Sequence, residues 1–184
     1  SLDKNFGVVK LNDPRNDLIR LNLDEKKSLL KNNIIFGKSH AFYKSLVLKN
    51  YKDIRWALGS LYFKGKVIKM LPSVNVLVDI KNVSENLLHL IGYIKIKNIA
   101  VEVSFLEKIA IYIFRRKKSI YYFDYCILNK FKISPFILHD ILVFLGFTKI
   151  AGTYNISYWI KKKINNYKST YDKDNPFYVL KKLQ

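Results

Sequence analysis

The residues around position 37 are of types that could bind phosphate. Gly37-Lys38-Ser39 follows an apolar run and matches the last residues of a phosphate-binding loop, where backbone N–H groups cradle phosphates and the lysine reaches the outer ones. The complete motif needs a glycine five residues before the Gly-Lys pair, and Asn32 stands there. We therefore expect a turn between a strand and a helix rather than an ATP site. A nucleotide-dependent enzyme that uses Lys38 or Asp79 is one alternative.

The acidic residues do not form the carboxylate pair that a metal-dependent enzyme would need. Asp79 ends an apolar run, but Leu77 and Lys81 occupy the positions from which a second carboxylate would help it to hold a divalent ion. The sequence predicts that Asp79 ends a strand and caps the following turn.

The histidines and the single cysteine give no catalytic or metal-binding pattern. His40, His89 and His139 lack the spacing of metal ligands, and we expect each on the surface or on a helix face. Cys126 is expected to pack as a small apolar residue, and a lone cysteine excludes a disulfide framework. We therefore expect a chain without catalytic residues, cofactor or metal.

The charge of the chain points to a polyanionic partner. Its 184 residues include 33 Lys and Arg against 14 Asp and Glu, a net charge of +19. Aromatic residues are interleaved with the cations, a pattern that favours nucleic acid. An anionic membrane surface is the second candidate. No apolar run reaches the roughly 20 residues of a membrane helix. We expect neither a membrane partner nor a homo-oligomer.

Three clusters of cations are the candidate residues for binding nucleic acid, with phosphate neutralisation as their expected role. They are Arg55, Lys64 and Lys66; Arg115, Arg116, Lys117 and Lys118; and Lys161, Lys162 and Lys163. Trp56, within the first cluster, is expected to pack and to hold its loop.

The apolar pattern predicts the elements that would position these residues. Strands are expected over 33–36, 74–80 and 99–105, and helices over 21–33, 41–50, from Ser84 onward, and 136–145. Residues 51–66 are expected to form a loop, and 109–114 a strand or the start of a helix. The alternation of strands and helices predicts βαβ units and a parallel sheet. The expected organisation is an irregular arm (1–20), an α/β core (21–150) and a basic aromatic extension (151–184).

The C-terminal part allows a different interpretation, a helix-turn-helix over 133–163. Its turn would lie at Leu145-Gly146-Phe147, and residues 154–163 would form the recognition helix in the DNA major groove. A DNA-binding protein is therefore the second functional alternative.

Several segments resemble one protein family in the same order. Arg55-Trp56-Ala57-Leu58-Gly59-Ser60-Leu61 resembles the Arg-Trp-Leu-Gly-Gly-Thr-Leu stretch of the bacterial-type ribosomal small-subunit protein 2 family. Upstream of it, residues 34–39 are similar to the family's strand that ends in Val-Gly-Thr-Lys, and residues 71–79, 99–103 and 122–130 are similar to segments that follow in the family. The similarity covers roughly residues 30–145.

The resemblance implies a Rossmann-like (flavodoxin-like) α/β core, a parallel sheet flanked by helices, with the family's helical hairpin lost and a basic C-terminal extension added. It also implies a structural constituent of the small ribosomal subunit, bound to small-subunit rRNA and to neighbouring ribosomal proteins. The abundance of Lys, Asn, Ile, Tyr and Phe is typical of AT-rich genomes. We therefore expect a divergent mitochondrial member; a plastid or a reduced bacterium is the alternative source.

Overall fold

The computed structural model describes residues 2, 6–11, 21–62, 74–80, 83–116, 120–153 and 156–161. The strands are β1 (Val8–Lys10), β2 (Ile34–Phe36), β3 (His40–Tyr43), β4 (Val76–Leu77), β5 (Tyr93–Ile96), β6 (Ile99–Glu102), β7 (Tyr121–Phe123), β8 (Phe147–Gly152) and β9 (Ser157–Lys161). The helices are α1 (Leu23–Lys31), the 3-10 helix η3 (Lys44–Leu46), α2 (Lys49–Tyr62), α3 (Glu85–Leu90), α4 (Val103–Phe114), α5 (Tyr125–Phe131) and α6 (Pro135–Phe144).

The strands form three small antiparallel sheets, so the expected Rossmann-like parallel sheet is wrong. Their strand orders are β1-β3-β2, β4-β6-β5 and β7-β9-β8. Short turns join β2 to β3 and β5 to β6, and Lys97 in the second turn has a left-handed φ of 52°. Such turns can join only antiparallel neighbours, because a parallel pair needs a crossover of a dozen or more residues. The βαβ interpretation fails at these two hairpins.

Several element boundaries also differ from the sequence-based expectations. The helix expected over 41–50 is strand β3 followed by η3, and the loop expected over 51–66 contains most of α2. The strand expected over 99–105 ends at Glu102, where α4 begins and continues to Phe114. Strand β1 lies in the arm that we expected to be irregular, and it pairs with β3. The strand near 33–36 and the helix that starts at Ser134-Pro135 are confirmed.

The C-terminal recognition helix is likewise wrong. Residues 157–161 form β9, which pairs antiparallel with both β7 and β8. Trp159 of this strand is almost completely buried, so the strand belongs to the core. Residues 133–161, apart from 154 and 155, therefore provide one helix and a hairpin, without a second helix to enter a major groove.

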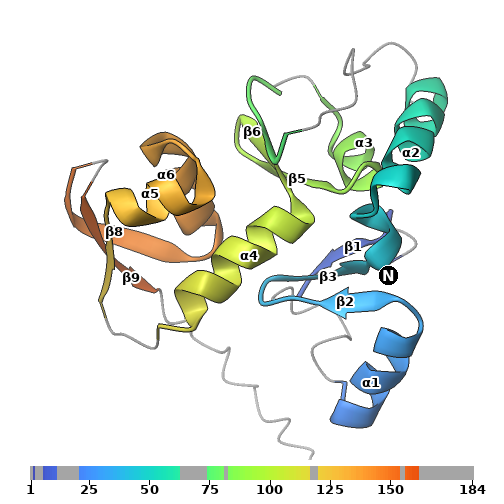
Figure 1. Cartoon of the computed structure of the whole chain (residues 1–184), viewed down its shortest axis with the longest axis horizontal. Helices are drawn as coiled ribbons and strands as arrows, with labels where there is room; N and C mark the ends of the chain where they lie inside the picture. Colours follow the sequence, from blue (N-terminus) through green and yellow to red (C-terminus); the bar gives the residue numbers. More distant parts are fainter. Residues whose placement is uncertain are drawn as a thin grey trace, which may run out of the picture.

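Helix α4 is the centre of the molecule. Figure 1 shows it running between the group formed by α5, α6, β8 and β9 and the two sheets nearer the N-terminus. Side chains on nearly every side of α4 are buried, including Val103, Leu106, Ile109 and Ile113. A helix that is apolar on most sides must be covered on most sides, and the largest cluster of buried residues is built around it.

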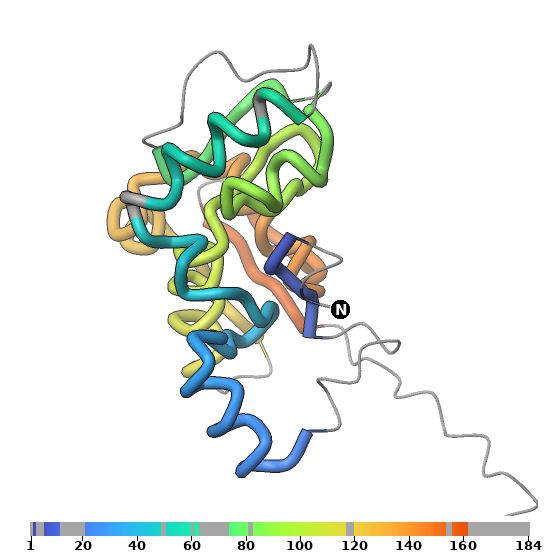
Figure 2. Tube along the Cα trace, turned by 90° about the vertical axis from the view of Figure 1, so that its right-hand side faces the viewer, coloured from blue at the N-terminus to red at the C-terminus, as the bar shows by residue number. Residues whose placement is uncertain are grey.

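A smaller cluster lies beneath α2 and α3. It contains Leu88 and Tyr93, and the half-buried Trp56 packs against it from α2. Trp56 does pack, as expected, although it lies on a helix and not in a loop. Helix α1 lies at the bottom and helix α2 at the top of the view in both Figure 1 and Figure 2.

Candidate anion-binding site

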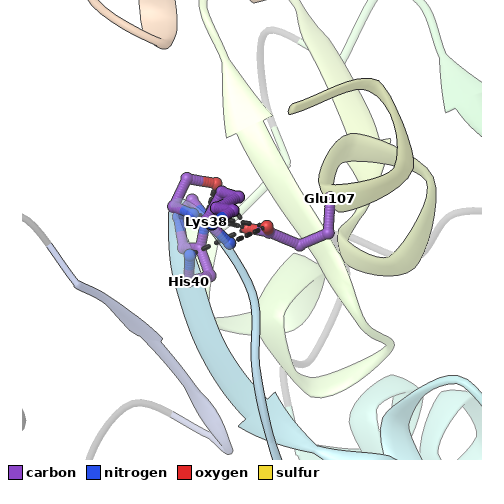
Figure 3. Close-up of polar contacts among 4 residues, drawn as sticks. Lys38, His40 and Glu107 are labelled. Atoms are coloured by element: carbon purple, nitrogen blue, oxygen red, sulfur yellow. Dashed lines mark hydrogen bonds and ion pairs between the residues drawn. The ribbon is translucent and has the colours of Figure 1, made fainter. Parts of the chain in front are cut away.

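The turn between β2 and β3 is held by a carboxylate from α4. The backbone N–H groups of Lys38, Ser39 and His40 donate to the carboxylate of Glu107, with donor–acceptor distances of 2.5, 3.1 and 2.8 Å. The Ser39 hydroxyl donates to the same group at 2.5 Å. Figure 3 shows Glu107 reaching from α4 to this turn. Successive backbone N–H groups that point at one spot form an anion-binding concavity, and here the chain's own carboxylate fills it.

Glu107 is ionised in spite of its burial. It is only 4% exposed. Burial by itself raises the pKa of a carboxyl group, but the hydrogen bonds from His40, Ser39 and the Lys38 backbone together hold the pKa of Glu107 below its ordinary value. A buried charge with four donors anchors the turn much more firmly than a neutral side chain would.

Gly37 makes room for this carboxylate. A Cβ atom placed on Gly37 would overlap the carboxyl group and the Cγ atom of Glu107. Gly37, which matches the end of a phosphate-loop motif in the sequence, therefore lets the backbone approach an internal anion. The expectation of a strand-to-helix turn here is wrong, because Lys38 and Ser39 lie in the turn of a β-hairpin.

Ser39, His40 and Glu107 contain the residue types of a hydrolytic triad without its geometry. A triad needs one imidazole nitrogen on the hydroxyl and the other on the carboxylate. Here His40 Nδ1 lies 2.8 Å from Ser39 Oγ and 3.5 Å from Glu107 Oε1, so a single nitrogen faces both groups. The hydroxyl donates to the carboxylate, not to a base. The cluster therefore stabilises the turn and provides no activated nucleophile.

His40 does not occupy the surface or helix-face position that we expected. It is buried in β3, and its ring stacks on Phe144 with the two planes 2° apart and the centroids separated by 5.8 Å. The expectation that Cys126 packs as a small apolar residue is also wrong, because Cys126 is exposed at the start of α5.

A small recess opens beside the hairpin turn. Its volume is about 270 Å³, and three lysines line it: Lys10 from β1, Lys38 from the turn and Lys161 from β9. Phe114 and Phe144, the last residues of α4 and α6, form apolar walls. We call this the lysine recess. It combines cations that lie far apart in the sequence.

The phenylalanine rings hold two of the ammonium groups. Lys10 Nζ lies 4.8 Å from the centroid of Phe144, and Lys161 Nζ lies 4.3 Å from the centroid of Phe114. Cation–π attraction acts at these distances. The structure records no ion pair for Lys38 or Lys161 within its described residues.

The lysine recess carries a net positive charge. The C-termini of α4 and α6 contribute roughly −0.5 each, and Glu107 contributes a full negative charge behind the turn. Three ammonium groups outweigh these contributions by about one unit. A positive field of this kind attracts anions. In nucleic acid the anionic groups are the phosphates of the backbone.

The structure brings one of the predicted rRNA-binding residues, Lys161, into this recess. Arg55 lies elsewhere, half-buried on α2, where it donates to Ser45 Oγ at 2.9 Å and burial lowers its pKa. Arg116 lies over the ring of Tyr112 and donates to its hydroxyl, and Arg115 is exposed directly after α4. Lys64, Lys66, Lys117, Lys118, Lys162 and Lys163 lie outside the described residues.

Sequence reasoning missed two features of the site. Lys10 is a single cation in a segment that we expected to be irregular, and no local signal marks it. Glu107 lies within an apolar run whose neighbours are mostly buried. A charged residue inside such a run requires a partner, and this was the signal that could have identified it.

The described part of the chain contains neither a cluster of metal ligands nor a membrane-spanning helix. No three His, Cys, Asp or Glu side chains lie close enough there to hold a metal ion. None of its helices has the length and apolar character needed to cross a bilayer.

No protein-family model matches this chain, and comparisons with curated proteins and with solved structures give no match either.

Proposed function

We propose that this chain is a structural RNA-binding protein of the small ribosomal subunit, which holds rRNA through its phosphates and catalyses no reaction. The observation that supports the proposal most directly is the convergence of Lys10, Lys38 and Lys161 on one recess. The net charge of +19 supplies the long-range attraction for a polyanion. Phosphate contacts fix the position of a protein on RNA without reading its sequence.

The ribosomal setting rests on the sequence segments. The antiparallel sheets lend the family resemblance no support, since that family is expected to have a parallel sheet. What supports the setting is the ordered set of similar segments over roughly residues 30–145, together with the positive charge. A mitochondrial ribosome is the compartment that the composition favours.

We further propose that α2 contacts a neighbouring ribosomal protein. Tyr51, Ile54, Leu58 and Leu61 follow one another at spacings of three, four and three residues and are 51, 57, 57 and 75% exposed. These spacings place them on one face of the helix. Apolar rows of this kind are typical of sites that another helix covers.

The opposite face of α2 is already used. A Cβ atom on Gly59 would lie 2.7 Å from Leu87 Cδ1, which shows how closely α2 approaches α3. A second copy of this chain is a poor occupant for the exposed row, because each copy carries +19. A neighbouring protein with acidic residues beside its apolar ones fits better.

Binding of small-subunit rRNA at several salt concentrations tests the RNA part of the proposal. The full chain is compared with the double variant Lys38→Gln/Lys161→Gln and with the matched double variant Lys27→Gln/Lys108→Gln, whose lysines are exposed and lie outside the recess. We expect the recess variant to bind at least about tenfold more weakly than the control. No RNA binding by the full chain would contradict the proposal, and equal affinity of the two variants would exclude the recess as its contact with RNA.

A further inference from the structure

We infer that the lysine recess is a discrete site for a single phosphate group, with Lys38 as the lysine whose backbone position is fixed in advance. This inference rests on the proposed function and deepens it. A diffuse basic surface could bind RNA without a defined site for one phosphate group. It assigns a ligand chemistry to Lys10, Lys38 and Lys161 together.

The ammonium groups are partly ordered before a ligand arrives. Lys10 and Lys161 lie over Phe144 and Phe114 at 4.8 and 4.3 Å from the ring centroids. When a ligand fixes the ammonium group of an otherwise mobile lysine, the four methylene groups of the side chain lose rotamer freedom. Contacts that already restrict the side chain lower this cost for the ligand, which is the basis of preorganised binding.

The walls of the recess favour a compact oxyanion over a nucleobase. The faces of Phe114 and Phe144 are already in contact with ammonium groups, and His40 also stacks on Phe144. A base would have to displace these cations in order to stack. A phosphate group can accept hydrogen bonds from them where they are.

Glu107 acts here as a positioning residue. Its carboxylate fixes the backbone N–H groups of Lys38, Ser39 and His40. The Cα atom of Lys38 is therefore held, and only its side chain must adjust to the anion. Lys38 is also one of the two recess lysines for which the described residues provide no ion-pair partner.

The phosphate could belong to a 5′ end of RNA, to an internal phosphodiester or to a free nucleoside monophosphate. The shared chemistry is the same in all three, a tetrahedral oxyanion of one to two negative charges. The arms of the experiment separate these sources.

Calorimetric titration of the full chain with inorganic phosphate, at constant ionic strength and with chloride as the background anion, tests the inference. We expect saturable binding at one site, weakened about tenfold or more by Lys38→Gln and by Lys161→Gln. Lys108→Gln removes the same charge from an exposed position on α4 and leaves the binding of phosphate unchanged. Circular dichroism of each variant confirms that it is folded.

Three further ligands identify the source: adenosine monophosphate, and a short single-stranded RNA with either a 5′-phosphate or a 5′-hydroxyl. Preference for the 5′-phosphorylated RNA identifies a terminal phosphate, and equal affinity for both RNAs, with competition by inorganic phosphate, identifies an internal one. Tight binding of the mononucleotide without affinity for either RNA retains the site and contradicts the proposed function.

The opposite outcome is equally distinct. RNA binding that inorganic phosphate does not compete with, or that Lys108→Gln weakens as much as Lys38→Gln, would overturn the discrete site and leave the proposed function standing. Failure to bind phosphate, nucleotide and RNA alike would overturn both.

Discussion

Glu107 and Ser39 are joined by both hydrogen-bond donors of the serine: its backbone N–H and its hydroxyl donate to Glu107 Oε1, at 3.1 and 2.5 Å. The two residues lie 68 positions apart in the sequence. This contact ties the central helix α4 to the hairpin turn that carries Lys38, so the position of a candidate ligand-binding lysine depends on the core of the protein.

Removal of the carboxylate should destabilise the fold. Glu107→Ala leaves buried donors of the turn without an acceptor, and each such group costs about 1–3 kcal/mol. Because water from the neighbouring recess can reach some of them, we expect a total loss of about 2–4 kcal/mol in the free energy of unfolding. Urea denaturation measures it.

Lys108→Ala is the matched control for this variant. Its side chain is the next one along α4 and is exposed, so its effect should stay within about 0.5 kcal/mol. A loss below about 1 kcal/mol for Glu107→Ala would mean that the turn does not depend on the carboxylate.

The depressed pKa of Glu107 makes stability depend on acid pH. The unfolded chain takes up this proton near the ordinary value of 4.5, and the folded chain does so only at lower pH. Stability from this group is therefore complete above the unfolded pKa and is lost as the pH falls through the folded one. Glu107→Gln should remove this part of the slope as the pH falls below the ordinary value of 4.5. Identical slopes for the two proteins would show that the group does not titrate as described.

Gly37 and Glu107 should be energetically coupled. Gly37→Ala places a methyl group against the carboxylate, and overpacking of this kind costs about 1–3 kcal/mol. A Glu107→Ala background removes the three atoms nearest to the added methyl group, so the same substitution should cost less there. A double-mutant cycle from thermal or urea unfolding measures the difference. Strict additivity of the two substitutions would argue against the close approach.

The apolar row on α2 should matter for assembly and little for folding. Ile54→Glu and Leu58→Glu change side chains that are 57% exposed, so the free energy of unfolding should move by no more than about 0.5 kcal/mol. Incorporation into the small subunit, measured with tagged variants in cells, should fall.

Leu23→Glu is the control for the α2 variants, since Leu23 is also exposed, at 76%, but lies on α1, away from α2. Unchanged incorporation of the α2 variants, or an equal loss for the α1 control, would exclude the row as a specific contact.

Local signals in the sequence were sufficient for only part of the fold. Helix α6 was predictable because Ser134, Pro135 and Gly146 mark its ends, and the structure shows the Ser134 hydroxyl accepting from the Ile137 N–H. Helix α4 was not predictable in the same way. Its run of β-branched and aromatic residues has the local preference of a strand, and in the structure tertiary packing overrides this preference.

The part of the candidate site that is formed by consecutive residues could be recognised in the sequence. Gly37-Lys38-Ser39 is a local pattern, and it drew attention to the correct turn. The Glu107 carboxylate and the ammonium groups of Lys10 and Lys161 meet this turn only through long-range packing. No spacing rule along the chain encodes such contacts.

Sedimentation of native lysate through sucrose gradients at moderate and high salt, with this chain followed by mass spectrometry, tests the central claim most directly. We predict that the chain migrates with the small ribosomal subunit and remains with it in the high-salt gradient, because a structural constituent is held by many phosphate and protein contacts. Recovery of the chain only at the top of the gradient, or with DNA, would contradict a role in the ribosome.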